Sequence, residues 1–306
     1  MIISILYLLI GSVLLYFGAD WMIKSSVHIA SKLNISRFVI GLTIVAFGTS
    51  LPELGVSLKA ALFNKSDIAI GNIIGSNITN VLLVLGLSSM FNPILISFSK
   101  IKKDILIYLF VCILLVFLLQ NGILERWEGV LLFTGIIFYT IHSFVTDKSH
   151  DEDFEDLFST WRRTIIFLVL GIILLYIGSE SFIKGAVDFA KIIGVSDLII
   201  GMSVVALGTS LPELVTSVFA AVKKEHSISV GNIIGSNLFN ILSVLGLVSI
   251  IKPLSVESSI FRFEIPIMIA AGLLLIPISL RQRPISKVIS LSMLFGYSVF
   301  ICILFT

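Results

Sequence analysis

The stretch "AFGTSLPE", from Ala46 to Glu53, contains the features from which the fold of this chain can be inferred. It lies within a long apolar run, and yet it ends in a proline followed by a carboxylate. The stretch "ALGTSLPE" repeats it from Ala206 to Glu213, again within an apolar run. A helix breaker and a charge placed twice in this way predict a polar site inside an apolar protein.

The composition indicates an all-α membrane protein. Of the 306 residues, 57% are hydrophobic and 13% are charged, whereas about 25% are charged in a soluble protein. Apolar runs recur at the length that a membrane-spanning helix needs. A net charge of +2, without basic runs, excludes nucleic acid as a partner. We expect ten transmembrane helices, at residues 3–22, 37–62, 68–92, 104–120, 128–146, 164–183, 197–222, 228–251, 263–280 and 286–305.

The two halves of the chain are copies of each other. A shift of 160 residues, without gaps, places "GNIIGSN" at 71–77 over the identical "GNIIGSN" at 231–237. Because five spans is an odd number, the second copy enters the membrane from the opposite side, which predicts two inverted five-helix repeats. The predicted units are a first repeat (1–145), a cytoplasmic linker (146–163) and a second repeat (164–306).

The distribution of Lys and Arg predicts the orientation. Most of the 21 Lys and Arg residues fall in the loops that face inward when both termini lie outside, as the positive-inside rule requires. The chain is short and has no large regulatory domain, so we expect a monomer in the lipid bilayer of a prokaryotic plasma membrane.

Two glutamates are the strongest candidates for a functional role. Glu53 is the only ionisable residue in 38–58, and Glu213 is the only one in 198–222. A charge at the centre of a membrane helix costs about 2.5–3.5 kcal/mol, so such a residue faces a cavity or a partner. The "GNIIGSN" segments contain no Lys, Arg or His. A bound cation is therefore the predicted partner, although burial could also hold a lone glutamate neutral.

The residues around each glutamate supply further oxygen atoms. Pro52 and Pro212 remove a backbone N–H and disturb the helix four residues earlier, which frees carbonyl oxygens at the depth of the glutamates. Hydroxyl oxygens come from Thr49, Ser50, Thr209 and Ser210.

The "GNIIGSN" segments add a second polar face. In each helix that carries the segment, three polar side chains recur every four residues and share one side of the helix. They are Asn72, Ser76 and Asn80 in the first copy, and Asn232, Ser236 and Asn240 in the second. The less favoured alternative is that the glycines make this only a packing face between helices. A set of oxygen ligands with two carboxylates suits Ca²⁺ better than Mg²⁺. One Ca²⁺ or two Na⁺ neutralise the carboxylates, which favours obligatory exchange.

At these motifs the chain resembles the sodium/calcium exchanger family of the calcium/cation antiporter superfamily, over essentially its whole length. The resemblance implies an antiporter that exchanges Na⁺ for Ca²⁺ by alternating access. Proton-coupled relatives usually carry a different glutamate motif, which favours Na⁺ as the driving ion.

The resemblance also implies a role for each motif residue. Glu53 and Glu213 would be carboxylates shared by Ca²⁺ and Na⁺, and Thr49 and Thr209 would offer backbone carbonyls to Ca²⁺. Flanking Na⁺ sites would be lined by the Ala46 and Ala206 carbonyls and by Ser50, Ser76, Ser210 and Ser236. Asn80 and Asn240 would complete the centre, where many family members carry an aspartate instead.

Other functions fit the sequence less well. An H⁺/Ca²⁺ exchanger or another cation/Ca²⁺ exchanger is the nearest alternative. A cation channel is less favoured, because a selectivity filter needs a ring of equivalent groups. We expect no enzyme activity and no cofactor, since no HExxH, His/Asp or Ser/Lys set occurs.

Two charge pairs and two spans lie outside the predicted site. Asp20 with Lys24, and Glu180 with Lys184, have the i, i+4 spacing of a helix salt bridge. The first and sixth spans carry no motif, and we expect them to slide against the motif helices during transport.

Overall fold

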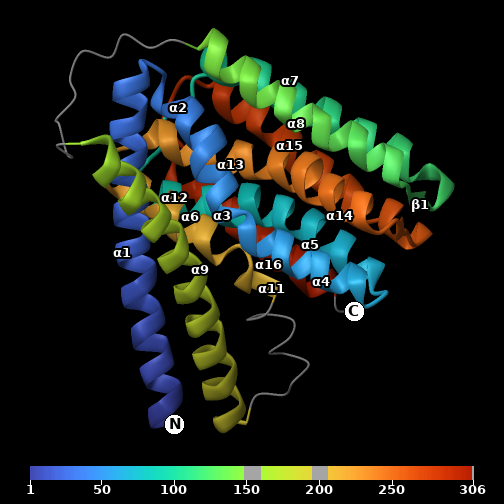
Figure 1. Cartoon of the computed structure of the whole chain (residues 1–306), viewed down its shortest axis with the longest axis horizontal. Coiled ribbons are helices and arrows are strands. Elements are labelled where there is room, and N and C mark those ends of the chain that lie inside the picture. The colour runs from blue at the N-terminus through green and yellow to red at the C-terminus, as the bar shows by residue number, and fades with distance from the viewer. Residues whose placement is uncertain (148–159, 195–205, 305–306) are drawn as a thin grey trace.

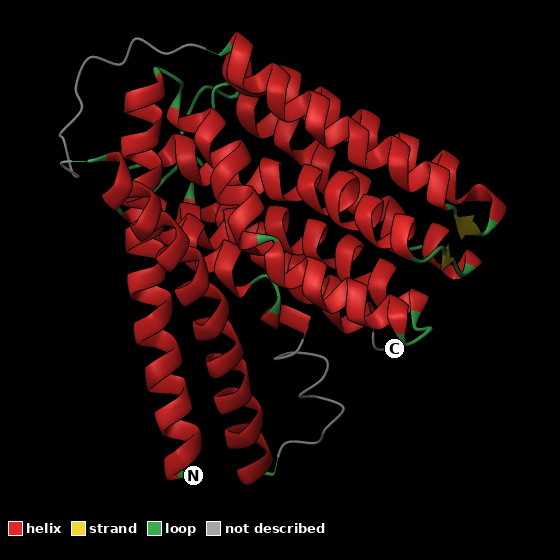
Figure 2. Cartoon of the chain, viewed as in Figure 1, coloured by secondary structure: helices red, strands yellow, loops and turns green. Residues whose placement is uncertain are grey.

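The computed structural model describes residues 1–147, 160–194 and 206–304. These residues are almost entirely helical (Figure 2). Within them, eight helices are long and apolar enough to cross a membrane, or nine when one bent pair counts as a single span. An all-α membrane protein is therefore confirmed. Three parts of the predicted segments lie outside the described residues: 148–159 of the linker, 197–205 of the seventh span, and residue 305.

The first half contains a broken helix early and two long helices late. Its elements are α1 (Ile2–Leu33), α2 (Arg37–Ile40), the π-helical turn η1 (Gly41–Val45), α3 (Ala46–Thr49), α4 (Leu51–Leu62), α5 (Ser66–Thr79), the π-helical turn η2 (Asn80–Val84), α6 (Leu85–Phe91), α7 (Phe98–Leu118), the 3₁₀ turn η3 (Leu119–Asn121), β1 (Ile123–Leu124) and α8 (Arg126–Thr146).

The second half repeats the order of the helices where it is described. Its elements are α9 (Trp161–Ile192), α11 (Ala206–Gly208), α12 (Leu211–Val222), α13 (His226–Leu238), the π-helical segment η5 (Phe239–Leu245), α14 (Gly246–Ile251), β2 (Leu254–Ser255), the 3₁₀ turn η6 (Ser258–Phe261), α15 (Glu264–Leu280) and α16 (Lys287–Leu304). The strand and 3₁₀ turn of the second half precede α15, whereas those of the first half follow α7. Strands β1 and β2 pair antiparallel and join the two halves at one end of the molecule (Figure 1).

The same backbone conformations recur 160 residues apart. Ser50 and Ser210 both leave the helical region, with φ −84° and ψ 6° at the first and φ −82° and ψ 6° at the second. Asn92 and Lys252 each end their helix in an extended conformation with φ −145° and ψ 118°. The duplication in the sequence is therefore also a duplication in local structure.

Helices α1 and α9 are longer than the predicted spans 3–22 and 164–183, because they continue to Leu33 and Ile192. The predicted ends were placed where polar residues begin. Polar residues end the stretch that can lie in hydrocarbon, but they do not end the backbone hydrogen bonding of a helix. The two helices run side by side and project from the rest of the protein (Figure 1).

Small residues spaced seven apart explain how α1 and α9 pair. A Cβ atom on Gly11, Gly18 or Gly178 would lie 2.6–2.9 Å from a backbone nitrogen of the other helix. The two backbones thus touch directly, as small residues allow in membrane helices. The pairing is antiparallel, because Gly11 meets Gly178 and Gly18 meets Gly171. The buried seam consists of Ser4, Gly11, Gly18 and Ser25 on α1 and of Thr164, Gly171, Gly178 and Gly185 on α9.

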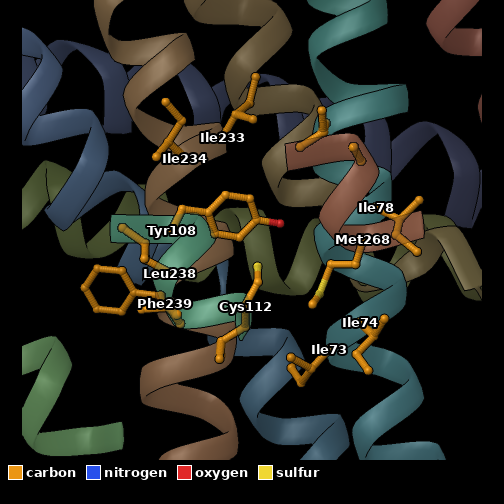
Figure 3. Packing of buried hydrophobic residues seen from close by; sticks show 14 of the residues in the cluster. Ile73, Ile74, Ile78, Tyr108, Cys112, Ile233, Ile234, Leu238, Phe239 and Met268 are labelled. Carbon is orange, nitrogen blue, oxygen red and sulfur yellow. The ribbon is translucent and has the colours of Figure 1, made fainter. Parts of the chain in front are cut away.

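The two "GNIIGSN" helices form the centre of the protein. Of the apolar window in each span, 72% is buried for Ser66–Phe91 and 89% for His226–Ile251, more than in any other described candidate span. Tyr108 of α7 packs beside Ile234 and Leu238 of α13 (Figure 3). Apolar side chains of α7 thus pack directly against α13 at the centre of the protein.

Candidate ion-binding site

Both glutamates lie just after a break in a helix. Helix α3 ends at Thr49 and α4 begins at Leu51, and the two parts of this span are bent by 42°. In the second half, α11 ends at Gly208 and α12 begins at Leu211. Each restarted helix has a proline and then the glutamate in its first turn. The predicted loosening of the helix is confirmed, and it places each carboxylate near the positive end of a helix dipole.

The two carboxylates are buried and face the opposite half of the chain. Glu53 is 0% exposed and Glu213 is 1% exposed. Ser50 Oγ donates a hydrogen bond to Glu213 Oε1 at 3.1 Å, and Ser210 Oγ donates one to Glu53 Oε1 at 3.5 Å. The remaining oxygen of each carboxylate, Oε2, is buried without a hydrogen-bond partner. Such an oxygen is costly unless a cation or another group satisfies it.

Two asparagines connect the halves on either side of the glutamates. Asn72 Nδ2 donates to Ser57 Oγ at 3.0 Å, and Asn72 Oδ1 accepts from Thr209 Oγ1 at 3.2 Å. Asn232 makes the equivalent bonds, to a serine of α12 at 2.9 Å and from Thr49 at 3.2 Å. Both amides therefore already use an oxygen and an N–H within the protein, and they tie each threonine to the other half.

The central asparagines retain unpaired groups. Asn80 Nδ2 donates to Asn237 Oδ1 at 3.1 Å, while Asn80 Oδ1 is buried without a partner. Both amide atoms of Asn240 are buried without a partner. These amide oxygens and the two free carboxylate oxygens are hard donors of the kind that Ca²⁺ and Na⁺ prefer.

The remaining predicted residues lie beside this centre. Ser76 and Ser236 are buried, and Ser236 Oγ lies 3.3 Å from Thr49 Oγ1. The Ala46 carbonyl accepts the Ser50 N–H at 3.0 Å, so this oxygen is partly occupied within the helix. Ala206 is the first described residue of α11.

Helices α2 and α3 and the turn η1 cover one side of the site. Thr49, Asn232 and Ser236 are fully buried there. A Cβ atom at Gly231 or Gly235 would lie within 3 Å of backbone atoms of Phe38 or Leu42, so this segment packs directly on α13.

Ion pairs join helices at the end of the site near Asn232. Arg37 Nη1 contacts both carboxylate oxygens of Glu225, at 2.7 and 2.9 Å, where α2 packs against the start of α13. Asp20 pairs with Lys24 at 2.7 Å, which confirms the predicted helix pair, and it also binds Lys223 at the end of α12. This second contact links α1 to a motif helix.

The other predicted charge pair differs from the expectation. Lys184 donates a hydrogen bond to the Tyr7 hydroxyl at 3.2 Å and lies over the Tyr7 ring. The partner thus comes from α1 and not from Glu180 on the same helix, because the close packing of α1 and α9 places the tyrosine within reach.

A sequence profile described as sodium/calcium exchanger protein matches residues 3–145 and 163–306. The chain belongs to this family. The two matched stretches lie on either side of the polar segment that divides the sequence.

Relatives of the exchanger family resemble the chain over nearly its full length. The sodium/calcium exchanger MaX1 of Methanosarcina acetivorans is 36% identical, over 99% of this chain and 99% of its own. The inner membrane protein YrbG of Escherichia coli is 30% identical, over 93% of this chain and 91% of its own. A solved structure of the sodium-calcium exchanger NCX_Mj, soaked with zero Na⁺ and Ca²⁺, superposes with a TM-score of 0.86 at 34% identity and 99% coverage of both chains.

Two serines beside the candidate site were not singled out from the sequence. Ser57 and Ser217 lie four residues after the glutamates and hold the asparagines Asn72 and Asn232. Alignment of the two halves could have found them, because a serine occurs at the same place in both copies. Asn237 lies within a recognised motif, but its sequence position does not reveal that it contacts Asn80.

Proposed function

We propose that the chain is a secondary active antiporter that exchanges Na⁺ for Ca²⁺ across a membrane by alternating access. The observation that carries this proposal is the pair of buried carboxylates, each with an unpartnered oxygen, that contact opposite halves of the chain. Their charge of −2 is neutralised by one Ca²⁺ or by two Na⁺. A loaded site can then change its accessibility at low electrostatic cost, whereas an empty one cannot.

The proposed ligands follow from this arrangement. Glu53 and Glu213 would bind both ions, and the carbonyls of Thr49 and Thr209 would bind Ca²⁺. Asn80 and Asn240 would complete the centre through the buried Oδ1 atoms that lack partners. The flanking Na⁺ sites would be lined by Ser50, Ser76, Ser210, Ser236 and the carbonyls of Ala46 and Ala206.

The proposed architecture consists of ten transmembrane helices in two inverted repeats, 1–145 and 164–306, joined by a linker at 146–163. Recurrent backbone conformations and reciprocal hydrogen bonds between the halves support it. Helices α1 and α9 would slide as a pair along the motif helices. The protein would act as a monomer in a prokaryotic plasma membrane, with both termini outside and the linker in the cytoplasm.

The relatives support the choice of ions. MaX1 carries the name sodium/calcium exchanger, and NCX_Mj is described as a sodium-calcium exchanger. The "GTSLPE" motif occurs twice in this chain, once in each half, so the same exchange is the function that its site supports best.

Reconstitution into proteoliposomes tests the proposal. Vesicles loaded with Na⁺ and diluted into Na⁺-free buffer should take up Ca²⁺, and replacement of internal Na⁺ by choline should abolish the uptake. Protein-free vesicles serve as the control. Uptake that ignores the Na⁺ gradient but follows a pH gradient would refute Na⁺ coupling and indicate the H⁺/Ca²⁺ exchanger.

A further inference from the structure

Two asparagines at the same place in identical motifs make different hydrogen bonds. Asn77 and Asn237 are both fully buried, and both are the last residue of "GNIIGSN". Asn77 Nδ2 donates to the Ile73 carbonyl of its own helix at 2.7 Å. Asn237 Oδ1 instead accepts from Asn80 Nδ2, which belongs to the other half of the chain, at 3.1 Å.

This bond determines which end of the Asn80 side chain remains free. An amide has an oxygen that accepts and an NH₂ group that donates. Asn237 occupies the NH₂ group, so the buried atom left without a partner is the oxygen Oδ1. The reverse orientation would present N–H groups, which repel a cation. At Asn240, the equivalent of Asn80, both amide atoms lack a partner.

We propose that Asn237 is a positioning residue that orients the Asn80 amide, so that its oxygen and not its NH₂ group faces the transported cation. Asn237 itself does not bind the ion. The inference rests on the proposed function, because it takes the centre near Asn80 to be part of the cation pathway. It also makes the two copies unequal, since Asn77 does not provide this orientation for Asn240.

The size of the effect follows from the bond that is lost. Without the Asn237 acceptor, the Asn80 amide can rotate, and part of the population presents its NH₂ group to the site. The bond is one between neutral groups, and its loss changes the balance between the two orientations of the amide. The ratio of the two orientations shifts by about tenfold, and only the fraction that presents the oxygen binds the cation. We therefore expect a severalfold fall in apparent cation affinity, of at most about tenfold.

The test compares four variants of the full-length protein: Asn237→Ala, Asn77→Ala, Asn80→Asp and the double variant Asn80→Asp/Asn237→Ala. The readouts are the half-saturating Ca²⁺ concentration and the inhibitory Na⁺ concentration of flux in proteoliposomes. Asn237→Ala should weaken at least one of them severalfold, by at most about tenfold. Asn77→Ala, the matched control, should stay within about twofold of the parent.

The Asn80→Asp background separates orientation from packing. The carboxylate that this substitution introduces has an oxygen at both outer positions, so rotation cannot present a donor, and Asn237→Ala should then cause no further loss. An equal loss in both backgrounds would show a packing role and overturn the proposal. An equal loss in Asn77→Ala, or no loss in Asn237→Ala, would overturn it as well.

Two measures keep the test decisive. If Asn237→Ala does not fold, Asn237→Asp replaces it in the test. The aspartate retains an acceptor for Asn80, so this variant should keep the parent's cation affinity or exceed it. A tenfold fall in its affinity would overturn the proposal. The comparison needs only Ca²⁺ flux, so uptake without Na⁺ dependence would refute the proposed exchange and leave this test intact. Shifts in melting temperature caused by Ca²⁺ or Na⁺ in detergent give the same comparison without transport.

Discussion

Replacement of Glu213 by glutamine should weaken Ca²⁺ binding far more than Na⁺ binding. The two side chains have nearly the same shape, and the glutamine carbonyl can still accept the hydrogen bond from Ser50 that Glu213 Oε1 accepts at 3.1 Å. The substitution therefore removes one negative charge and little else. The charge is 1% exposed, so solvent screens it weakly.

Coulomb's law gives the scale of the difference. At an effective dielectric constant of about 20, two unit charges about 4 Å apart interact with about 4 kcal/mol, and a divalent ion doubles this to about 8 kcal/mol. Since about 1.4 kcal/mol is a factor of ten, Ca²⁺ affinity should fall by about five to six powers of ten and Na⁺ affinity by about three. The fold should survive, because a buried charge has been removed and none has been left unpaired.

The assay is ion binding followed by the melting temperature of the purified protein, together with Ca²⁺ flux in proteoliposomes. Glu53→Gln should behave in the same way, since Glu53 occupies the equivalent position. Glu257→Gln is the control, because Glu257 is an exposed acid outside the site. If Glu213→Gln carried Ca²⁺ within tenfold of the parent, or lost Na⁺ binding more than Ca²⁺ binding, the electrostatic reasoning would be wrong.

Three further substitutions test the parts that surround the site. Gly178→Val should lower the melting temperature and abolish flux, because a Cβ atom there would lie 2.9 Å from a backbone nitrogen of α1. Gly296→Ala is the control and should be tolerated, because a Cβ atom at Gly296 meets no atom within 4 Å. Asp20→Asn should free α1 from Lys223 at the end of α12 and change the ratio of forward to reverse Ca²⁺ flux, and an unchanged ratio would contradict this role. Ser50→Ala should reduce the apparent Ca²⁺ affinity measured by flux about tenfold, far less than Glu213→Gln does. A loss of affinity as large as that of Glu213→Gln would contradict this prediction.

Much of the centre could be predicted because its chemistry is local. A proline removes a backbone N–H wherever it occurs, and a carboxylate alone in an apolar run needs a partner. These two facts predicted the breaks before Pro52 and Pro212 and the importance of Glu53 and Glu213. The four-residue spacing of the polar side chains likewise placed Asn80 and Ser76 on one helix face, beside the glutamates.

Features that depend on tertiary contacts could not be predicted in the same way. The seven-residue spacing of Gly11 and Gly18 is visible in the sequence, but only the structure shows that α9 is the partner. The ends of α1 and α9 were predicted too early, since hydropathy reports the membrane and not the helix. The hydrogen bonds of Asn72 and Asn232 could not be predicted either, because each accepts one from a threonine of the other half of the chain.

The difference between the two "GNIIGSN" segments has a physical consequence for the mechanism. Their seven residues are identical, so local preferences cannot give them different hydrogen bonds. Asn77 and Asn237 nevertheless make different ones, the first within its own helix and the second to the other half of the chain. The difference therefore comes from tertiary contacts and not from the motif. One such contact is close, because a side chain added at Gly235 would collide with the Leu42 carbonyl oxygen. Under the proposed alternating access, the two copies would exchange tertiary contacts of this kind. Identical motifs suit that exchange, because either copy can make either set of contacts with the same local interactions.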